Sequence, residues 1–499
     1  MMLVFVFSGW TLTKNNFFVF DDYHNLVSLP YLKFTDMMHI LPNYAYCSRP
    51  VGWIIVKILL NLFGLNYKYH VITILCIHGI NGILTYFLVL NFFKEEKYKR
   101  VFAFISALIF SIYPISNMPS YWESAIFDLF GTTLMLICFN IFFVIENINI
   151  KDKKCSKKKI CLSIVLFLLY YISLRTKEMF IALPVLLIIY SLFNDFFKDK
   201  GIVNLKNNFK EFNFKKFIKK NIYLLFIILV MFAYFIYSCV LNKTNEYTTN
   251  VQGNYYYTFN LKVIITNIYN YICMYFNPIS LLYGDVLTLI SFGKLYKIVV
   301  LLAIIVISFL SIYKFLNGEY IYLFAIIGYI AIIMPVLPMP NLHGIWYLYA
   351  PAIFISLIIV AVLNDLLNLI LKFIKKDKVK IIIISLMIVI CVVFLAYANN
   401  LGNIKAFRNW WIEFAKNYKI TYEYFTNLKQ EYKDTKKIYV LNVPDGYTTL
   451  YIEDGGIIKV AFDDPNLKIF LNDNNYNNEN NDEILVVDFN DYDFKLLNK

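Results

Sequence analysis

Two adjacent carboxylates, Asp21 and Asp22, directly follow the apolar run Phe17–Phe20 in the first hydrophobic part of the chain. Ionisable side chains at a membrane boundary are costly to place, which makes them candidates for function. Two carboxylates this close do not ionise together easily, so one of them can serve as a proton acceptor, or a divalent cation can neutralise both. A solvated turn that ends a hydrophobic segment is the alternative interpretation.

Arginine is scarce in this chain, because only four of the 47 Lys and Arg residues are Arg: Arg49, Arg100, Arg175 and Arg408. The planar guanidinium group binds two phosphate oxygens at once. Three of the four fall in segments that are predicted below to face outside, against the usual bias of basic residues. We therefore interpret Arg49 and Arg175 as candidate phosphate ligands, with Lys177 as a further point charge. Chance placement of four residues is the alternative.

All five histidines fall in the same outward segments or in the helix next to them: His24, His39, His70, His78 and His343. His70 and His78 are about two helical turns apart and share a helix face. A histidine in an apolar helix is more often a packing residue than a ligand, so both interpretations stay open. His24 and His39 could bind a metal ion together with the acidic pair, although no ligand spacing requires it.

Two glutamates complete the set of candidate side chains. Glu123 follows Trp122 at a membrane boundary, where an interfacial tryptophan is expected in any case. Glu178 follows Lys177, and the two could simply pair with each other in a loop. Pairing does not exclude contact with a substrate, so both glutamates remain site candidates.

The composition is that of a helical membrane protein. Of 499 residues, 59% are hydrophobic and 19% aromatic, and the mean hydropathy is +0.58. Residues 1–397 carry 35 basic against 18 acidic side chains, whereas residues 398–499 carry 12 against 16. The basic excess belongs to the apolar part and indicates membrane topology, so no nucleic-acid partner is expected. The eight scattered cysteines predict neither a disulfide framework nor a zinc site.

Hydrophobic runs predict eleven spanning helices. For the first, two alternatives stay open: a late start codon truncates it, or it runs on through Phe20. Met1–Leu12 alone is too short to span and shows no cleavage site, so we expect no cleaved signal peptide. The other ten are predicted at 69–93, 101–115, 124–145, 160–174, 179–197, 221–241, 297–315, 320–336, 347–371 and 380–397.

The connecting loops predict the orientation. Alternate loops hold 24 of the 35 basic residues and are expected in the cytoplasm: 94–100, 146–159, 195–220, 372–380 and the turn at Lys314. The remaining segments are then expected outside: 13–68, 116–123, 174–178, 242–296, 337–346 and the residues after 397. With its Lys-, Asn- and Ile-rich composition, the chain is expected to be a multi-pass protein of a bacterial plasma membrane with a cytoplasmic N-terminus.

Two outward segments are predicted to be structured. Val51–Leu60 is apolar but too short to span, which is typical of a helix in the membrane interface, and 242–296 is expected to pack on the outer surface. Residues 398–499 are expected to form a small α/β or β domain, with strands at Lys437–Val443, Thr448–Ile452 and Glu483–Asp488. The expected domains are thus 1–397, with a large outer loop 13–68, and 398–499.

Several segments, in this order, resemble motifs of the GT-C glycosyltransferases, which are polytopic enzymes that take sugars from polyprenyl-phosphate carriers. They are Asp21-Asp22; Arg49-Pro50 with Phe63-Gly64-Leu65-Asn66, Tyr69-His70, His78 and Asn81; Pro114 to Trp122 with Asp128; Lys177-Glu178 with Pro184; and Tyr347-Leu348-Tyr349-Ala350-Pro351. The likeness is strongest for the membrane region of the protein O-mannosyltransferase-like and tetratricopeptide-repeat-associated members. It covers about residues 17–360.

The chain departs from the family pattern at three positions. Met118 stands where an acidic residue is usual, Trp346 where the family has arginine, and Tyr113 where it often has histidine. By the resemblance, Glu123 or Glu178 could replace the missing acid. Arg175 or His343 could replace the missing cation.

The resemblance implies an all-α polytopic membrane bundle of the GT-C type with a small extracytoplasmic C-terminal domain. It implies transfer of a monosaccharide, as a hexosyl group, from a polyprenyl-phosphate donor to an extracytoplasmic glycan, lipid or protein acceptor, by a single inverting displacement. Asp21 leads the pair and is expected to be the base, with Asp22 second. Arg49, Arg175, Lys177 and His343 are expected at the donor phosphate, and a divalent metal ion near the acidic pair is left open.

Two other classes of function are compatible with the sequence. A transporter or flippase of lipid-linked glycans would often show internal repeats and charges at mid-membrane. The ionisable groups here gather at one face, which favours an enzyme. A non-catalytic cell-surface assembly protein is the second alternative, because three family positions are altered.

Overall fold

The computed structural model describes most of the chain: residues 16–38, 49–94, 96–148, 153–197, 212–244, 256–276, 294–341, 343–374, 376–400, 402–444, 448–451, 454–473, 483–490 and 493–497. The described chain divides into two compact units. The first, here called the membrane unit, contains Cys76–Ser120 and Phe127–Lys405. The second, here called the sheet unit, contains Val6–Leu75, Tyr121–Ile126 and Ala406–Lys499.

This division differs from the expected boundary after residue 397. The loop expected at 13–68 belongs to the same unit as the C-terminal residues, and the boundary lies after Lys405. The reason is a shared hydrophobic core, in which Phe18 and Tyr23 of the loop are buried together with Tyr418 and Phe425. Burial of these four large aromatic side chains in one core stabilises the packing of the loop against the C-terminal segment.

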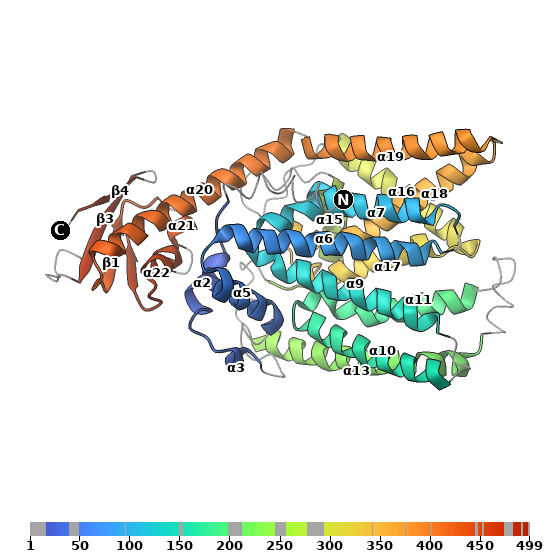
Figure 1. Ribbon diagram of the computed structural model, residues 1–499, viewed down its shortest axis with the longest axis horizontal. Helices are drawn as coiled ribbons and strands as arrows, with labels where there is room; N and C mark the ends of the chain where they lie inside the picture. Colours follow the sequence, from blue (N-terminus) through green and yellow to red (C-terminus); the bar gives the residue numbers. More distant parts are fainter. Residues whose placement is uncertain are drawn as a thin grey trace. The chain divides into compact units, whose positions relative to one another are not determined.

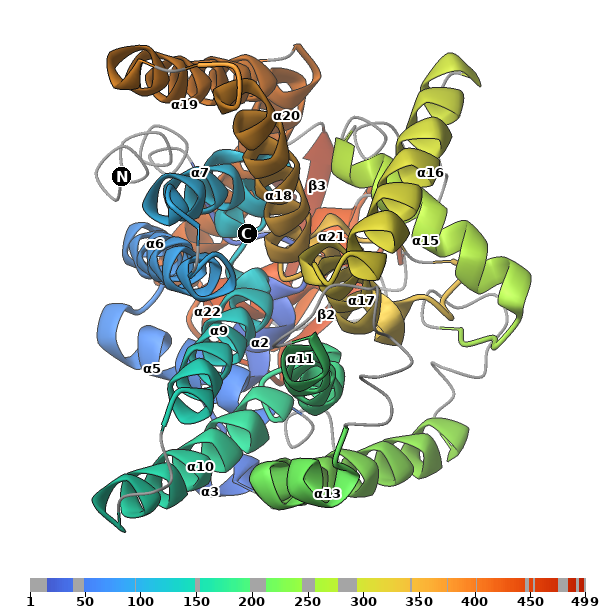
Figure 2. The same cartoon turned by 90° about the vertical axis from the view of Figure 1, so that its right-hand side faces the viewer.

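The membrane unit is entirely helical in its described part. Its long helices are α6 (Tyr67–Phe92, which also contributes to the sheet unit), α7 (Lys99–Ile112), α9 (Ile126–Glu146), α10 (Lys153–Leu174), α11 (Leu183–Phe197), α13 (Phe214–Thr244), α15 (Leu261–Phe276), α16 (Lys294–Leu316), α17 (Ile321–Ile333), α18 (Ala352–Leu371) and α19 (Asp377–Asn400). Figure 2 looks along them, with α9, α11, α17 and α18 inside the bundle and α10, α13, α16 and α19 at its rim.

Fewer helices than the expected eleven meet the length and composition needed to cross a membrane. Within the described residues seven do, or eight if the bent pair Lys99–Ile112 and Pro114–Tyr121 is one span. α10 begins in a lysine-rich stretch, the apolar helix Ile321–Val336 is short, and the first expected span falls largely outside the described residues. The chain is a multi-pass membrane protein, and this count of seven or eight covers the described residues alone.

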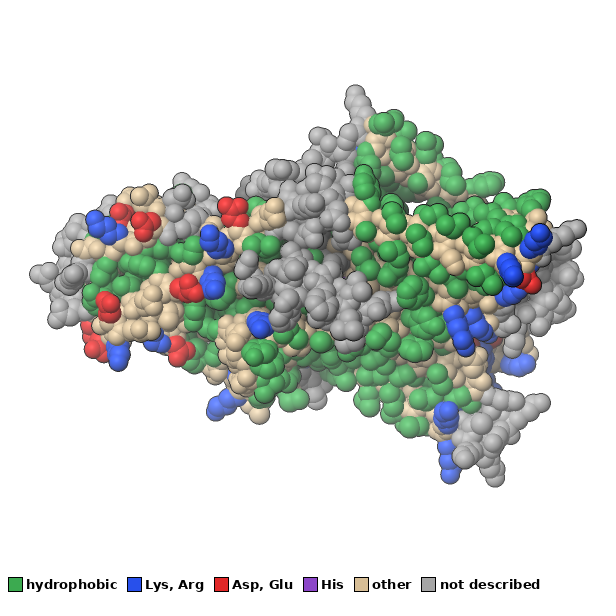
Figure 3. Space-filling view, turned by 45° about the horizontal axis from the view of Figure 1, so that its top comes forward, with side chains coloured by type: hydrophobic (Ala, Val, Ile, Leu, Met, Phe, Trp, Pro, Cys, Tyr) green, Lys and Arg blue, Asp and Glu red, His purple; other side chains and the backbone are tan. Residues whose placement is uncertain are grey.

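The rim helices present apolar side chains to their surroundings. Only 11% of the most apolar windows of α16 and α19 is buried, against 72% for α9. Figure 3 shows hydrophobic side chains over these helices, with Lys and Arg gathered at one end of the unit. Exposed apolar surface of this extent is stable only against lipid.

Inside the bundle, α17 packs against α18 and α18 against α7. A Cβ atom at Gly328 would overlap the ring of Phe354, so glycine lets α17 approach α18 closely. The expected packed segment 242–296 contains α15 in its described part.

The sheet unit carries a four-stranded sheet in the order β2-β1-β3-β4 (Figure 1). Its strands are β1 (Lys437–Leu441), β2 (Lys468–Leu471), β3 (Ile484–Asn490) and β4 (Asp493–Leu496). β1 is parallel to both β2 and β3, and β4 is antiparallel to β3. This is an α/β domain, as one of the two expected alternatives.

Helices complete the sheet unit: α2 (Asp22–Ser28), α3 (Phe34–Met37), α5 (Pro50–Phe63), α20 (Gly402–Glu431), α21 (Thr448–Tyr451) and α22 (Gly456–Phe462). The prediction of a strand at Thr448–Ile452 is wrong, because Thr448–Tyr451 forms the helix α21. Leu450 is fully buried there and α21 packs on α22, so packing overrides the β-branched composition. The helix expected at Val51–Leu60 is present as α5.

Candidate active site

The acidic pair lies in a tight turn at the start of α2. The amide of Asp22 donates to the carbonyl of Val19 at 3.1 Å, which closes the turn over Phe20 and Asp21. Phe20 has φ +49° and Asp21 has φ −61°. A positive φ at the second residue of a turn normally selects glycine, so a phenylalanine there is strained. The turn places Asp21 on the surface and Asp22 inside.

Asp22 is completely buried, and both of its carboxylate oxygens accept hydrogen bonds from neutral donors. One carboxylate oxygen accepts from the amide of Val19 at 2.9 Å. The other accepts from the amide of Ser124 at 2.9 Å and from its hydroxyl at 2.6 Å. Burial, and then the nearby charge of Glu123, raise the pKa of Asp22 well above its usual value, although the three hydrogen bonds oppose this. The pKa of Asp22 is thus raised first by burial and second by Glu123, a neighbour that lies far from it in the sequence.

Glu123 and His70 form a buried pair beside Asp22. The Nε2 atom of His70 lies 2.9 Å from the carbonyl oxygen of Gly64, which can only accept, so Nε2 carries a proton. Its Nδ1 atom lies 3.1 Å from Oε1 of Glu123. These two contacts hold the His70 ring between the end of α5 and Glu123. The second oxygen of Glu123 is buried and makes no hydrogen bond within the described residues.

A glycine makes the first of these contacts possible. Gly64 ends α5 with φ +55° and ψ −139°, a conformation that other residues rarely adopt. This conformation ends the helix and leaves the Gly64 carbonyl oxygen at the His70 ring. The Gly64–His70 part of the family resemblance thus corresponds to a direct contact.

One face of α20 covers the acidic turn. It consists of Trp411, Phe414, Tyr418 and Tyr422, at helical spacing, and is called the aromatic face below. The ring of Phe20 stacks on Phe414, with centroids 4.6 Å apart. This contact lies entirely within the sheet unit.

The remaining loop candidates lie close to this core. Arg49 is half-buried and precedes the first residue of α5. His24 is half-buried, with its ring 6.0 Å from that of Trp53 in α5. Lys57, buried on α5, donates to the carbonyls of Leu29 and Pro30 and so satisfies the C-terminal end of α2.

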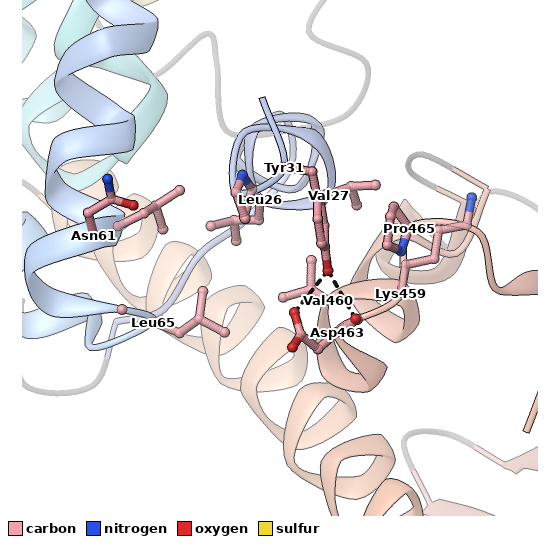
Figure 4. Close-up of a pocket in the computed structure, with 12 residues that line it drawn as sticks. Leu26, Val27, Tyr31, Asn61, Leu65, Lys459, Val460, Asp463 and Pro465 are labelled. Carbon is pink, nitrogen blue, oxygen red and sulfur yellow. Dashed lines mark hydrogen bonds between the residues drawn. The ribbon is translucent and has the colours of Figure 1, made fainter. Parts of the chain in front are cut away.

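A pocket of about 180 Å³ lies at the C-terminal end of α2, away from the acidic turn (Figure 4). Leu26 and Tyr31, the end of α5 around Asn61, and Lys459 and Asp463 from α22 and its cap line it. The hydroxyl of Tyr31 donates to both the carbonyl and the carboxylate of Asp463 at 2.9 Å. Partial burial and this bond raise the pKa of Tyr31 to about 12, so it stays a donor.

The membrane unit contains a contrasting buried acid. Asp128, in the first turn of α9, receives Nζ of Lys177 on both oxygens, at 2.6 and 2.5 Å. Both side chains are only 6% exposed, and Nζ lies 5.0 Å above the ring of Tyr347. Lys177 thus has a buried acidic partner, Asp128, that lies 49 residues away in the chain. Glu178, the next residue, is half-buried.

His343 and Arg175 are both buried in the membrane unit. Nε2 of His343 lies 2.8 Å from Oδ1 of Asn267, whose amide nitrogen donates to the carbonyls of Leu337 and Met339. Oδ1 therefore accepts a hydrogen bond from His343. Burial lowers the pKa of His343, so the ring is neutral at pH 7 and cannot replace the missing cation.

Other residues of the family resemblance form a neutral network in the same unit. His78 donates from Nε2 to the carbonyl of Ser111 and accepts from the Tyr349 hydroxyl, which lies 2.6 Å from Nδ1. Asn81 donates to the same Tyr349 oxygen at 3.0 Å and receives a bond from Thr133. His78 is thus a satisfied packing residue, one of the two interpretations left open by the sequence.

The metal hypothesis finds no ligand group in the part of the chain that the structure describes. There, no three His, Cys, Asp or Glu side chains come together as a metal ion would need. His39 lies outside the described residues. Asp21 and Asp22 also point to different environments, one exposed and one buried.

Sequence reasoning missed two residues of this site. Ser124 holds Asp22 through two hydrogen bonds, and its position after Glu123, just before an apolar helix, was the available signal. The positive φ of Phe20 had no sequence signal, because phenylalanine does not indicate such a turn.

Comparison with known proteins gives a likeness of fold. No protein-family model and no curated protein sequence matches the chain. The crystal structure of ArnT from Cupriavidus metallidurans bound to undecaprenyl phosphate matches over 97% of this chain and 92% of that one, with 9% identity and a TM-score of 0.50.

Two structures of the Archaeoglobus fulgidus oligosaccharyltransferase also resemble it, at lower scores. The apo form has 11% identity and a TM-score of 0.49 over 93% of this chain. The complex of AglB with an inhibitory peptide and a dolichol-phosphate has 12% identity and a TM-score of 0.48 over 92% of this chain. The chain spans about three fifths of their length, 62% and 61% respectively. The match to nearly the whole of ArnT confirms the expected architecture: the chain has the GT-C fold.

Proposed function

We propose that this protein is a membrane glycosyltransferase that moves a monosaccharide from a polyprenyl-phosphate donor to an extracytoplasmic acceptor. One observation carries the proposal: an exposed carboxylate, Asp21, stands on a turn fixed by a buried carboxylate in a chain of this fold. The likeness to ArnT, which was crystallised with undecaprenyl phosphate, supports the class of donor.

In this proposal Asp21 is the base. Asp22 is buried and occupied by Val19 and Ser124, so it braces the turn and cannot reach an acceptor as the structure stands. Asp21 is exposed and lies next to it. A carboxylate that takes a proton from a hydroxyl must be within hydrogen-bond reach of it, which favours Asp21.

The transfer is a single displacement. The acceptor hydroxyl oxygen forms a bond to the anomeric carbon while the bond from that carbon to the phosphate oxygen breaks, with inversion. The hydroxyl proton passes to Asp21, and the electron pair leaves with polyprenyl phosphate. Arg49 and Arg175 are the proposed phosphate ligands, because Lys177 is paired with Asp128 and His343 is neutral.

Glu123 and Glu178 have different places in the proposal. Glu123 sets the charge around the turn through His70 and Asp22 and does not contact substrate. Glu178 and His24 are half-buried and stay secondary candidates for acceptor binding. A divalent cation at the turn would have to use Asp21 together with the substrate phosphate, because Asp22 is already occupied.

Purified protein in lipid nanodiscs, supplied with polyprenyl-phosphate sugars, tests this function by release of polyprenyl phosphate. Asp21→Asn should lower transfer by about 10²–10⁴-fold. Asp36→Asn, which removes an exposed acid of the same loop, should not. Near-wild-type transfer by Asp21→Asn would show that Asp21 is not the base. Movement of intact lipid-linked glycan without any transfer would favour a flippase instead.

The proposed orientation places the N-terminus in the cytoplasm, residues 151–159 on the cytoplasmic side and residues 398–499 outside. The lysine distribution supports it. A cysteine introduced near Asn475 should react with impermeant reagent in intact cells, and one near Lys157 should not. The opposite labelling pattern would reverse the orientation and remove the extracytoplasmic acceptor.

A further inference from the structure

The acidic turn has a backbone that its own sequence disfavours. Phe20 has φ +49° where such a turn prefers glycine, and the next three amides close successive turns at 3.1 Å: Asp22 to Val19, Tyr23 to Phe20 and His24 to Asp21. A bulky residue persists in this conformation only when its surroundings hold it there. The contacts that keep Phe20 in this conformation come from α20.

The aromatic face of α20 contacts the turn at successive positions. Phe20 stacks on Phe414 at 4.6 Å and 23° between planes, and Tyr23 stacks on Tyr418 at 5.4 Å and 17°. Phe17 lies 5.5 Å from Tyr422. Aromatic residues on both sides of Asp21 are thus held by one helix, so the backbone between them is fixed at both ends.

α20 also reaches the segment that holds Asp22. The indole nitrogen of Trp411 donates to the side-chain oxygen of Asn16 at 3.2 Å. Asn16 donates to the carbonyl of Tyr121 at 2.9 Å, and the hydroxyl of Tyr67 donates to that same carbonyl at 2.7 Å. Tyr121 lies three residues before Ser124, so both sides of the Asp22 contact are linked to α20.

We propose that the C-terminal helix α20 positions the acidic turn, with Phe414 as the positioning residue for Asp21. The inference rests on the proposed function for its catalytic meaning, and on contacts within the sheet unit for its structural meaning. Without the ring of Phe414, Phe20 is expected to leave its positive φ, and Asp21 then samples directions in which it does not face an acceptor hydroxyl. Phe414 touches no substrate in this proposal.

Amide hydrogen exchange on the full-length protein in nanodiscs tests the structural part without any activity. Phe414→Leu should speed exchange at the amides of residues 22–24 at least tenfold. Phe414→Tyr keeps the stacking ring and should restore slow exchange. Tyr424→Leu is the matched control, because Tyr424 lies on the same helix but stacks on Phe494 of β4, at 5.0 Å. Unchanged exchange in a folded Phe414→Leu protein would overturn the proposal.

Kinetics test the catalytic part. Phe414→Leu should lower kcat at least tenfold while the KM for the polyprenyl-phosphate sugar changes less than threefold, because donor groups are not moved. Phe414→Tyr should recover most of kcat. A general loss of fold would instead lower the amount of active protein and be seen as a lower melting temperature. If the wild type transfers no sugar, the proposed function fails while the exchange experiment still decides whether α20 positions the turn.

Discussion

Two buried carboxylates in this protein, Asp128 and Asp22, have different hydrogen-bond partners: a cation for the first and neutral donors for the second. In the membrane unit, Asp128 receives a lysine on both oxygens, and its charge is compensated. In the sheet unit, Asp22 accepts three hydrogen bonds from neutral donors, and its neighbour Glu123 lies 3.1 Å from Nδ1 of His70. The first acid lies against a dedicated cation, whereas burial and then a neighbouring carboxylate raise the pKa of the second.

The difference separates structural from chemical acids. A buried acid that is paired with a dedicated cation serves the fold, and removal of either partner lowers the free energy of unfolding. A buried acid held by neutral donors beside another carboxylate responds to pH and to approaching charge. By this criterion Asp22, which braces the acidic turn, is the buried acid whose surroundings make it responsive to pH, whereas Asp128 is paired with a cation.

Breaking the compensated pair should have the largest effect. Lys177→Met leaves Asp128 buried without its cation and should lower the free energy of unfolding by about 3–5 kcal/mol. SDS titration in mixed micelles measures this. The double variant Lys177→Met with Asp128→Leu should recover most of the loss, because the two charges disappear together. A single variant as stable as wild type would contradict the assignment of this pair as structural.

The two proposed phosphate ligands, Arg49 and Arg175, sharpen the comparison. Arg49→Lys and Arg175→Lys keep the charge but lose the planar fork, which should cost about 1.5–3 kcal/mol of donor binding. Transfer at low donor should therefore fall by one to two decades. Arg100→Lys is the control, since Arg100 is exposed at the start of α7. If all three variants behave alike, the arginines of the two units are not phosphate ligands.

The pH dependence of stability should come from the sheet unit. The folded-state pKa of Asp22 is raised, so its contribution to stability is fully present below the unfolded pKa of about 4 and is lost as pH rises toward the folded pKa. The slope is at most about 1.4 kcal/mol per pH unit. Asp22→Asn should reduce the change in melting temperature between pH 5 and 8, and Asp36→Asn should leave that change as in the wild type. An equal slope in the Asp22 variant would show that its pKa is not the cause.

The smallest effect is expected at the pocket. Tyr31→Phe removes the bond to Asp463, and Tyr31 is 53% exposed. An exposed hydrogen bond of this kind contributes about 0.5 kcal/mol, the low end of the usual range. The melting temperature should therefore change little and transfer should stay at the wild-type rate. A large loss of transfer would give the pocket a role in the reaction that the comparison does not assign.

Local chemistry could be predicted from the sequence, and pairing could not. The helical bundle and the strands near residues 437 and 484 follow from composition and periodicity. The partners of Asp128 and His78 lie 49 and 271 residues away in the chain, and no spacing rule reaches that far. His343 was predicted as a cation because its type allows it. Its burial, which makes it neutral, depends on tertiary packing.

The contact between the acidic turn and α20 also sets the time at which this site can form. Asn16 and Trp411 are separated by 395 residues. At a synthesis rate of about 5–20 residues per second, roughly 20–80 s pass between the appearance of the two segments. The acidic turn is therefore synthesised before the helices of the membrane unit, and it can pack against α20 only after those helices have been synthesised. A ribosome that stops before α20 would leave an inserted protein whose acidic turn has no fixed geometry.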